Sequence, residues 1–171
     1  MMQMIYKKTL KMPKIVSNTT PIISLLKLNR LELLQQLYTQ IYIPLAVYNE
    51  IEAGKRKGFY EDLSNIDWIN IFEIENQQAV KYFLNLDAGE AEAIVLATEI
   101  SADLIILDEK LGRFHAKHAD LTVTGTIGIL IKAKTQGLIK ELKPLLNELT
   151  DKKVWISEKL KGEILKKVGE E

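Results

Sequence analysis

The chain has 171 residues, of which 47% are hydrophobic, so it can bury one sizeable core, and its length favours a single domain. Its 23 basic residues balance its 23 acidic residues, which excludes a molecule-wide attraction to nucleic acid or anionic lipid. The lack of cysteine excludes disulfides, thiolate zinc sites and cysteine nucleophiles, and agrees with a cytoplasmic location. No stretch is apolar enough for a signal peptide or a membrane span, so no membrane association is expected.

Short apolar runs alternate with helical stretches along the chain, which is typical of βαβ units around a mostly parallel sheet. After an N-terminal arm at residues 1–12, a strand at 15–16 leads through a polar turn into a helix whose expected N-cap is Thr20. The apolar spacing then predicts a helix at 31–38, a strand at 41–43, a helix at 44–51 and a strand at 69–72.

The second half of the chain continues the alternation. Asp87 precedes Glu90 by three residues, which predicts a capping box that opens a helix at 91–99. The unbroken apolar run at 104–107 predicts a central parallel strand buried on both faces. Helices are also expected at 110–118, 127–134 and 157–168, and helical spacing of apolar residues continues up to 149. A short strand is expected at 121–123. Together they predict a three-layer α/β/α domain at 13–150 and a C-terminal helical appendage at 151–171 packed on the same domain.

Polar side chains follow the predicted strands at the points where the strands end. Residues 17–20 follow the first strand, Glu50 comes shortly after the second, and Asp108 and Glu109 follow the run at 104–107, while Glu92 lies near the start of the preceding helix. Functional groups of open α/β sheets gather at the carboxyl ends of the strands. Carboxylates that converge there repel one another unless a cation lies between them, and oxygen ligands select Mg²⁺ or Mn²⁺.

Five blocks of the sequence, in this order, resemble the PIN domain. They are residues 15–23, 43–51, 87–94, 104–109 and 124–128. The resemblance covers about residues 13–149 and points to a poorly characterised prokaryotic subgroup that is similar to toxin ribonucleases of toxin-antitoxin pairs. It implies a nuclease fold with four acidic positions around one or two Mg²⁺ or Mn²⁺ ions.

Carried over position by position, the four acidic positions fall on Asn18, Glu50, Glu92 and Asp108. The resemblance implies that Asn18, Glu92 and Asp108 are metal ligands and that Glu50 is a ligand or a general base. Asn18 departs from the usual aspartate, and because its amide oxygen is neutral we expect a lower metal affinity. Asp108 is the strongest single candidate, since a carboxylate beside a fully apolar strand needs a compensating partner.

Five further residues are expected near this site. Thr19 and Thr20 match the hydroxyl residues that usually follow the first acidic position, and are expected to bind a metal-bound water or a phosphate oxygen. Lys110 and Arg113 follow the last acidic position within about one helical turn and are expected to meet the scissile phosphate or the product. Glu90 is expected mainly to cap its helix, with a metal role as the alternative.

Simpler explanations exist for these residues when each is taken singly. An asparagine such as Asn18 in a turn usually bonds its own backbone. Glu50, near the end of an amphipathic helix, would ordinarily be a solvated charge, and Glu109 is expected to be exposed. The lysines near the C-terminus are explained by a solvated helix face.

The resemblance implies an endoribonuclease that hydrolyses RNA phosphodiester bonds with a metal-activated water and acts as the toxin of a toxin-antitoxin pair. Two alternatives stay open. One is a catalytically degenerate nucleic-acid-binding module, in which Asn18 has abolished turnover. The other is a subunit that acts through protein contacts with an antitoxin-like partner. Because PIN-like domains commonly pair and the helices within 22–37 are apolar, a homodimer is expected.

Overall fold

A computed structural model describes residues 11–170, so most of the arm predicted at 1–12 lies outside the described residues. The strands form one five-stranded parallel sheet in the order β3-β2-β1-β4-β5. Their bounds are β1 (Ile15–Ser17), β2 (Ile41–Pro44), β3 (Ile69–Phe72), β4 (Leu104–Ile106) and β5 (Val123–Thr124). The predicted parallel sheet is therefore confirmed.

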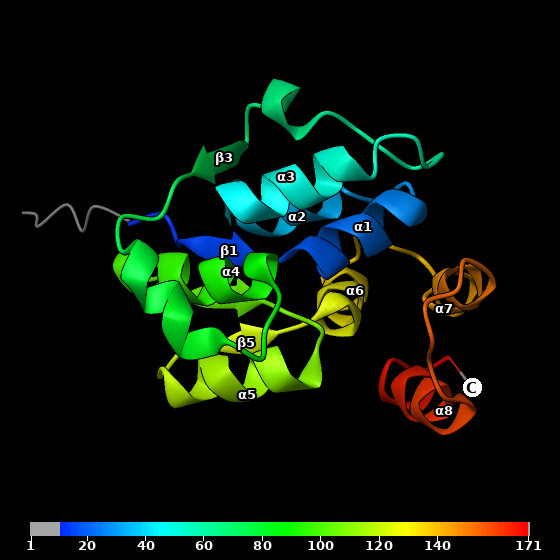
Figure 1. Ribbon diagram of the computed structural model, residues 1–171. Helices are drawn as coiled ribbons and strands as arrows, with labels where there is room; N and C mark the ends of the chain where they lie inside the picture. The colour runs from blue at the N-terminus through cyan, green and yellow to red at the C-terminus, as the bar shows by residue number, and fades with distance from the viewer. Residues whose placement is uncertain (1–10, 171) are drawn as a thin grey trace, which may run out of the picture.

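Helices connect the strands and cover both faces of the sheet (Figure 1). None of the helices within residues 11–170 has the length and apolar character that crossing a membrane requires. Two short 3-10 helices, η1 and η2, were not expected from the sequence. The helices are α1 (Thr19–Lys27), α2 (Leu33–Tyr38), α3 (Leu45–Ala53), η1 (Leu63–Asn65), η2 (Gln77–Phe83), α4 (Ala88–Glu99), α5 (Lys110–His118), α6 (Thr126–Thr135), α7 (Lys143–Asp151) and α8 (Glu158–Lys167).

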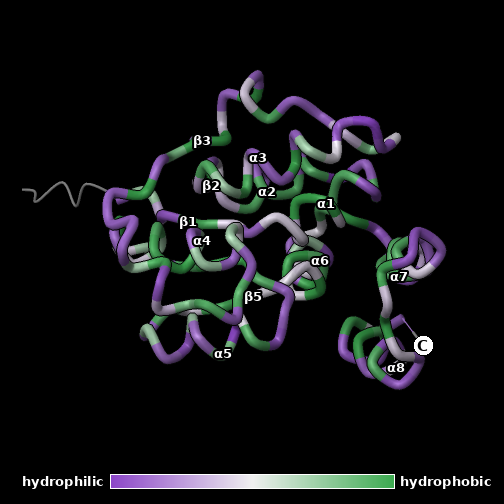
Figure 2. Tube along the Cα trace, in the orientation of Figure 1, coloured by the Kyte–Doolittle hydropathy of each residue, from purple (hydrophilic) through white to green (hydrophobic). Residues whose placement is uncertain are grey.

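The alternation of side chains along the central strands separates two hydrophobic cores. Ile15 and Ile106 lie in a core shared with α1, α2, α3, α6, α7 and α8. Val16, Ile105 and Leu107 lie in the other core, which α4 and α5 complete. The strands and the helix faces toward them are hydrophobic, whereas the segment after α3 is largely hydrophilic (Figure 2). The chain is thus the three-layer α/β/α fold that the sequence predicts.

The start of α1 differs from the prediction. The helix begins at Thr19 and its N-cap is Asn18, whose backbone is still extended at φ −80° and ψ 173°, so Thr20 is not the cap. Pro21 is accommodated because the N–H groups of the first turn need no helical acceptor. The capping box of α4 is confirmed, with the Asp87 side chain accepting from the backbone N–H of Glu90 and the Glu90 side chain accepting from that of Asp87.

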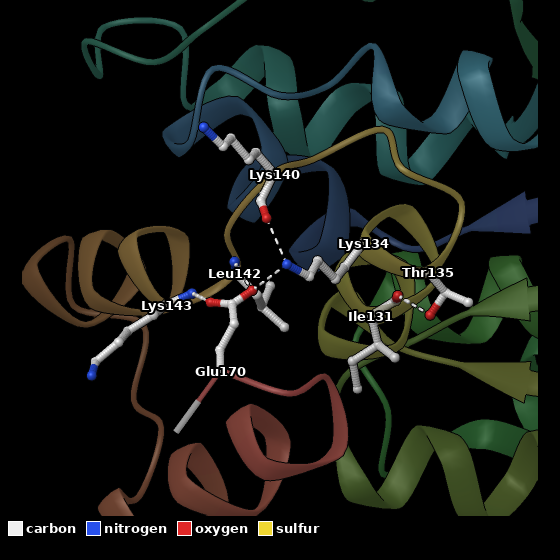
Figure 3. Close-up of polar contacts among 7 residues, drawn as sticks. All are labelled: Ile131, Lys134, Thr135, Lys140, Leu142, Lys143 and Glu170. Carbon is white, nitrogen blue, oxygen red and sulfur yellow. Dashed lines mark hydrogen bonds and ion pairs between the residues drawn. The ribbon is translucent and has the colours of Figure 1, made fainter.

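The C-terminal helix α8 packs on the same core as the strands, with Ile164 and Leu165 buried there. Its attachment ends in a cluster of hydrogen bonds around the Glu170 carboxylate (Figure 3). This carboxylate accepts from the backbone N–H groups of Leu142 and Lys143, at 2.7 and 2.8 Å, where α7 begins. The Lys134 ammonium of α6 lies 2.8 Å from the same carboxylate. Glu170 therefore joins the end of the domain to α6 and α7.

Partial burial alone would raise the pKa of Glu170, but the hydrogen bonds from Lys134 and from the two backbone N–H groups outweigh it and lower the pKa to about 2. A carboxyl group whose pKa is lower in the folded than in the unfolded chain stabilises the fold when it is ionised. This contribution is complete above the unfolded pKa of about 4.3 and is lost as the pH falls toward 2.

We predict that Glu170→Gln lowers the Tm at pH 7 by about 3 °C, because the charge-assisted hydrogen bonds at the start of α7 are weakened. The difference from the unmodified chain should shrink as the pH is lowered from about 5 to about 2. Circular dichroism melts at several pH values measure both effects. Glu163→Gln, an exposed position on α8, is the control and should leave the Tm unchanged. An equal shift of the Tm for both variants would contradict a stabilising role for the contacts of Glu170 with α6 and α7, which are called the Glu170 clasp below.

Candidate functional site

The carboxyl ends of β1, β2, β4 and β5 meet at one edge of the sheet, since all the strands are parallel. Polar residues follow each strand at this edge, as the sequence predicts.

Asn18, directly after β1, is almost fully buried at this edge, with 1% of its surface exposed. Its backbone N–H donates to the Ile106 carbonyl at 3.0 Å, which continues the pairing of β1 with β4. Its side chain makes no capping bond to α1. The Nδ2 group donates to Glu109 Oε2 at 3.4 Å, whereas Oδ1 is buried without a hydrogen-bond partner. Asn18 is therefore not an ordinary turn residue that bonds its own backbone.

Two threonines at the start of α1 hold two different carboxylates. The Thr19 hydroxyl donates to Glu50 Oε2, from α3. The Thr20 hydroxyl donates to Glu109 Oε1 at 2.5 Å, from the segment between β4 and α5. Glu109, which the sequence suggested would be exposed, is thus half-buried and bonded to both Asn18 and Thr20.

The Glu50 carboxylate lies against the first turn of α4. The backbone N–H of Gly89 donates to Glu50 Oε1 at 2.8 Å. A Cβ atom on Gly89 would lie 2.5 Å from Glu50 Oε2, closer than any real contact, so only glycine leaves room for the carboxylate in this position. Glu50 is therefore held between Thr19 of α1 and the first turn of α4, and Thr19 is the chain neighbour of Asn18.

Glu90 is the buried acid of the site, with 6% of its surface exposed. Its Oε1 atom has no hydrogen-bond partner and lies where a Cβ on Gly112 of α5 would come within 2.6 Å. Burial raises the pKa of Glu90, and the charges of Asp87, Glu109 and Glu50 raise it further, against the lowering effect of the backbone N–H of Asp87. An ionised Glu90 therefore costs stability as the pH rises through its raised pKa.

Asp108 and Arg113 lie on the side of the edge nearer to α6. The Asp108 carboxylate accepts from the Thr126 backbone N–H at 2.7 Å and from the Thr126 hydroxyl at 2.6 Å, at the N-terminus of α6. Arg113 Nη1 donates to the Leu107 carbonyl at 3.0 Å. A Cβ on Gly125 would meet both Asp108 and Arg113, at 2.6 and 2.9 Å. Asp108 thus reaches the predicted edge but is engaged by a helix terminus.

The remaining two predicted residues stand at the margin of this cluster. Glu92 Oε2 accepts from the Ala46 backbone N–H at 3.0 Å, so its carboxylate faces the N-terminus of α3, one helical turn before Glu50. Lys110 is exposed in the first turn of α5. The structure therefore brings Asn18, Glu50, Glu90 and Glu109 together, with Glu92 and Asp108 beside them.

The donor set of this cluster fits a hard divalent cation. Within residues 11–170 no three carboxylate or histidine side chains stand close enough, in their present rotamers, to hold one metal ion. However, Asn18 and Glu90 each carry a buried oxygen without a partner, and the pKa of Glu90 is raised by burial and by neighbouring negative charge. Oxygen ligands with an excess of negative charge suit Mg²⁺ or Mn²⁺.

A sequence model of the PIN domain matches residues 14–170. The chain belongs to the PIN domain family. PIN domains form a nuclease superfamily and generally use divalent metal ions, in agreement with the donor set at the sheet edge. The matched range includes α7 and α8. No curated protein matches the chain.

Glu109 and the glycines are features of this PIN domain that the sequence did not single out. The acid directly after Asp108 was visible in the sequence, but its direction was not. Gly89, Gly112 and Gly125 each leave space for a carboxylate, and only knowledge of the packing partner distinguishes them from helix-start glycines. The predicted roles of the individual site residues stay predictions.

We predict that Gly89→Ala weakens Mn²⁺ binding by about tenfold while the Tm is unchanged or higher. The added methyl group displaces the flexible Glu50 carboxylate, whereas alanine is the better helix former. Isothermal titration calorimetry measures the affinity. Gly162→Ala in α8, where a Cβ would meet nothing within 4 Å, is the matched control. Unchanged Mn²⁺ affinity in Gly89→Ala would remove Glu50 from the metal site.

Proposed function

We propose that this PIN domain is a divalent-metal-dependent endoribonuclease that hydrolyses RNA phosphodiester bonds. The observation that carries the proposal is the buried, unpartnered oxygen on each of Asn18 and Glu90, beside the carboxylates of Glu50 and Glu109 at the carboxyl edge of a PIN fold. Burying polar oxygens without partners costs free energy, which a bound cation would offset. Mg²⁺ and Mn²⁺ are the proposed cofactors.

Two ligand sets compete within this proposal. The family resemblance gives Asn18, Glu50, Glu92 and Asp108. The geometry supports Asn18, Glu50, Glu90 and Glu109, because Asn18 and Glu90 carry the buried oxygens without a partner, and the charges of Glu50 and Glu109 act on Glu90. In either set Asn18 supplies a neutral oxygen and Glu50 a charged one.

The cation would lower the pKa of the attacking water and neutralise charge that builds on the phosphoryl group. Glu50 is the proposed general base, with its carboxylate oriented by the Thr19 hydroxyl and the Gly89 N–H. The Thr20 hydroxyl holds Glu109 in the same way. Since these donors come from backbone and from short side chains on helices, the carboxylates are positioned before substrate arrives.

Basic groups near the acidic cluster are proposed to bind the phosphate. Lys110 projects from the first turn of α5 and has no hydrogen bond or ion pair within residues 11–170. Arg113 uses Nη1 on the Leu107 carbonyl, and its remaining N–H groups suit a phosphate or product. Thr19 and Thr20 are further proposed contacts to substrate oxygens.

The resemblance to toxin ribonucleases extends the proposal to the toxin of a toxin-antitoxin pair. A homodimer, an antitoxin-like protein partner and a cytoplasmic location stay predictions from the sequence.

We predict that the purified chain cleaves a fluorescent single-stranded RNA with Mn²⁺ and not with EDTA, and that Glu50→Gln lowers the rate about 100-fold or more, because a positioned base is lost. Gel electrophoresis of the products measures the rate. Glu163→Gln, exposed on α8, is the control and should retain full activity. Cleavage in EDTA, or full activity of Glu50→Gln, would contradict the proposal.

The same assay distinguishes the two ligand sets through paired variants. Each comparison changes one acid of a neighbouring pair and then the other. The two comparisons are Glu90→Gln with Glu92→Gln, and Glu109→Gln with Asp108→Asn. The member whose variant loses both Mn²⁺ affinity and cleavage is the ligand.

A catalytically degenerate module is the second candidate, and Asn18 is the observation that favours it. We predict that Asn18→Asp lowers the Tm in EDTA, because a second carboxylate would stand near Glu109, 3.4 Å from the present amide nitrogen, in a buried place. With Mn²⁺ present the same variant should bind the ion at least about tenfold more tightly. Thermal melts with and without Mn²⁺ measure both.

The outcomes for Asn18→Asp separate the two functions. An inactive natural chain that gains cleavage on substitution is a degenerate nuclease. A natural chain that already cleaves supports the enzyme, and unchanged Mn²⁺ affinity would show that Asn18 is not a ligand.

A further inference from the structure

Two adjoining cavities lead away from the acidic edge along α1. The first, of about 170 Å³, is lined by Glu50 and by Lys57, Phe59 and Tyr60 from the segment after α3. The second, of about 700 Å³, is lined by Lys57 and Phe59 again and by Lys27 of α1. The two cavities adjoin at Lys57 and Phe59 and are together named here the lysine groove, which has Glu50 among the residues that line it.

The far end of the lysine groove is formed by the turn after α7. Asp151, Lys152 and Lys153 line the larger cavity there. Figure 1 shows the segment after α3 and helix α7 on either side of the C-terminal end of α1. The groove therefore gathers residues from three parts of the chain that are distant in sequence.

The charge of the groove is strongly uneven in a chain whose net charge is zero. Four lysines and one aspartate line the larger cavity. Among the described residues, no hydrogen bond or ion pair engages the ammonium groups of Lys57 and Lys153, which are both exposed. These two charges are free to meet an anion.

The other two lysines make the far wall rigid. Lys27 Nζ donates to the Lys152 carbonyl at 3.2 Å, and Lys152 Nζ donates back to the Lys27 carbonyl. Lys152 also pairs with Glu148 at 2.6 Å. Lys27 Nζ lies 5.3 Å from the centroid of the Phe59 ring, so the aromatic side chain is held against this wall. The groove is built in the free protein rather than formed by a partner.

We propose that the lysine groove binds the single-stranded RNA that flanks the scissile phosphate, with backbone phosphates against Lys57 and Lys153 and a base against Phe59. This proposal rests on the proposed nuclease function, which it deepens. A flexible single strand binds well to a concave surface that combines lysines with an aromatic side chain. Its phosphates pair with the lysine charges, and its bases stack on the aromatic ring. A bilayer is flat and would not enter a depression. The lysines also offset the repulsion between RNA and the acidic edge.

The test measures binding of a fluorescein-labelled single-stranded RNA of about 12 nucleotides in EDTA, where metal-dependent cleavage is absent. The variant Lys57→Ala with Lys153→Ala removes only the two unpaired charges, so the fold should be retained, which thermal melts check. The expected result is about tenfold weaker binding and a dependence of log Kd on log salt that is lower by about 1.4, or about 0.7 per phosphate contact. The control, Lys159→Ala with Lys167→Ala, removes the same charge from exposed positions of α8 and should change neither quantity.

Phe59→Leu tests the stacking contact separately. It should weaken binding several-fold without changing the salt dependence, because no charge is lost. A variant that lowers the salt dependence as well would contradict this role.

A second readout separates this proposal from the nuclease proposal. Hydrolysis of bis(para-nitrophenyl) phosphate with Mn²⁺ needs the acidic edge, but this substrate is too small to reach the groove. The lysine double variant should therefore retain this activity. If RNA binding is lost but no chain hydrolyses any phosphodiester, the groove stands and the nuclease fails. If the natural chain does not bind the RNA, or if the double variant binds it as well as the control does, the groove proposal is overturned. An equal loss of binding to anionic lipid vesicles would also overturn it.

Discussion

Repulsion between carboxylates at the end of a parallel sheet is the constraint on which this structure depends. The parallel strands bring Glu50, Glu90 and Glu109 to one edge, and burial makes their repulsion stronger than it would be in water. The chain offsets part of this cost with short donors: hydroxyl groups on α1 and a backbone N–H at the start of α4. Glu90 keeps an uncompensated oxygen. A domain selected for stability alone would have no reason to keep this arrangement, which is why the edge is the natural place for a cation.

The fold could be predicted from the sequence because its signals are strong and local. The apolar run at 104–107, the capping box and Pro44 each fix an element within a few residues. The direction of the two acids that follow the run could not be predicted with the same ease. Leu107 packs on the side of α4 and α5, so the alternation of a strand turns Asp108 toward α6 and Glu109 toward Glu90. A sequence comparison identifies an acidic pair, but the packing decides which member joins the cluster.

The hydrogen-bond partners across the sheet edge could not be predicted from the sequence either, for a related reason. Thr20 was expected to cap a helix, yet its hydroxyl reaches Glu109, which lies 89 residues later in the chain. Such contacts follow from the register of β1 against β4, and register is a property of the assembled sheet. The uneven charge of the lysine groove was equally hidden, since its lysines are separated along the chain by helices and strands.

The Glu170 clasp has a consequence for the order in which the domain is completed. A ribosome makes every strand and the whole acidic edge before it reaches residue 170, so the nascent chain can assemble its sheet while α7 still lacks the acceptor for its first N–H groups. The turn after α7 supplies Lys152 and Lys153. Residues 142, 143, 152 and 153 therefore leave the ribosome before the carboxylate that fixes the start of α7, and the hydrogen bonds of Glu170 are among the last contacts of the described chain that can form.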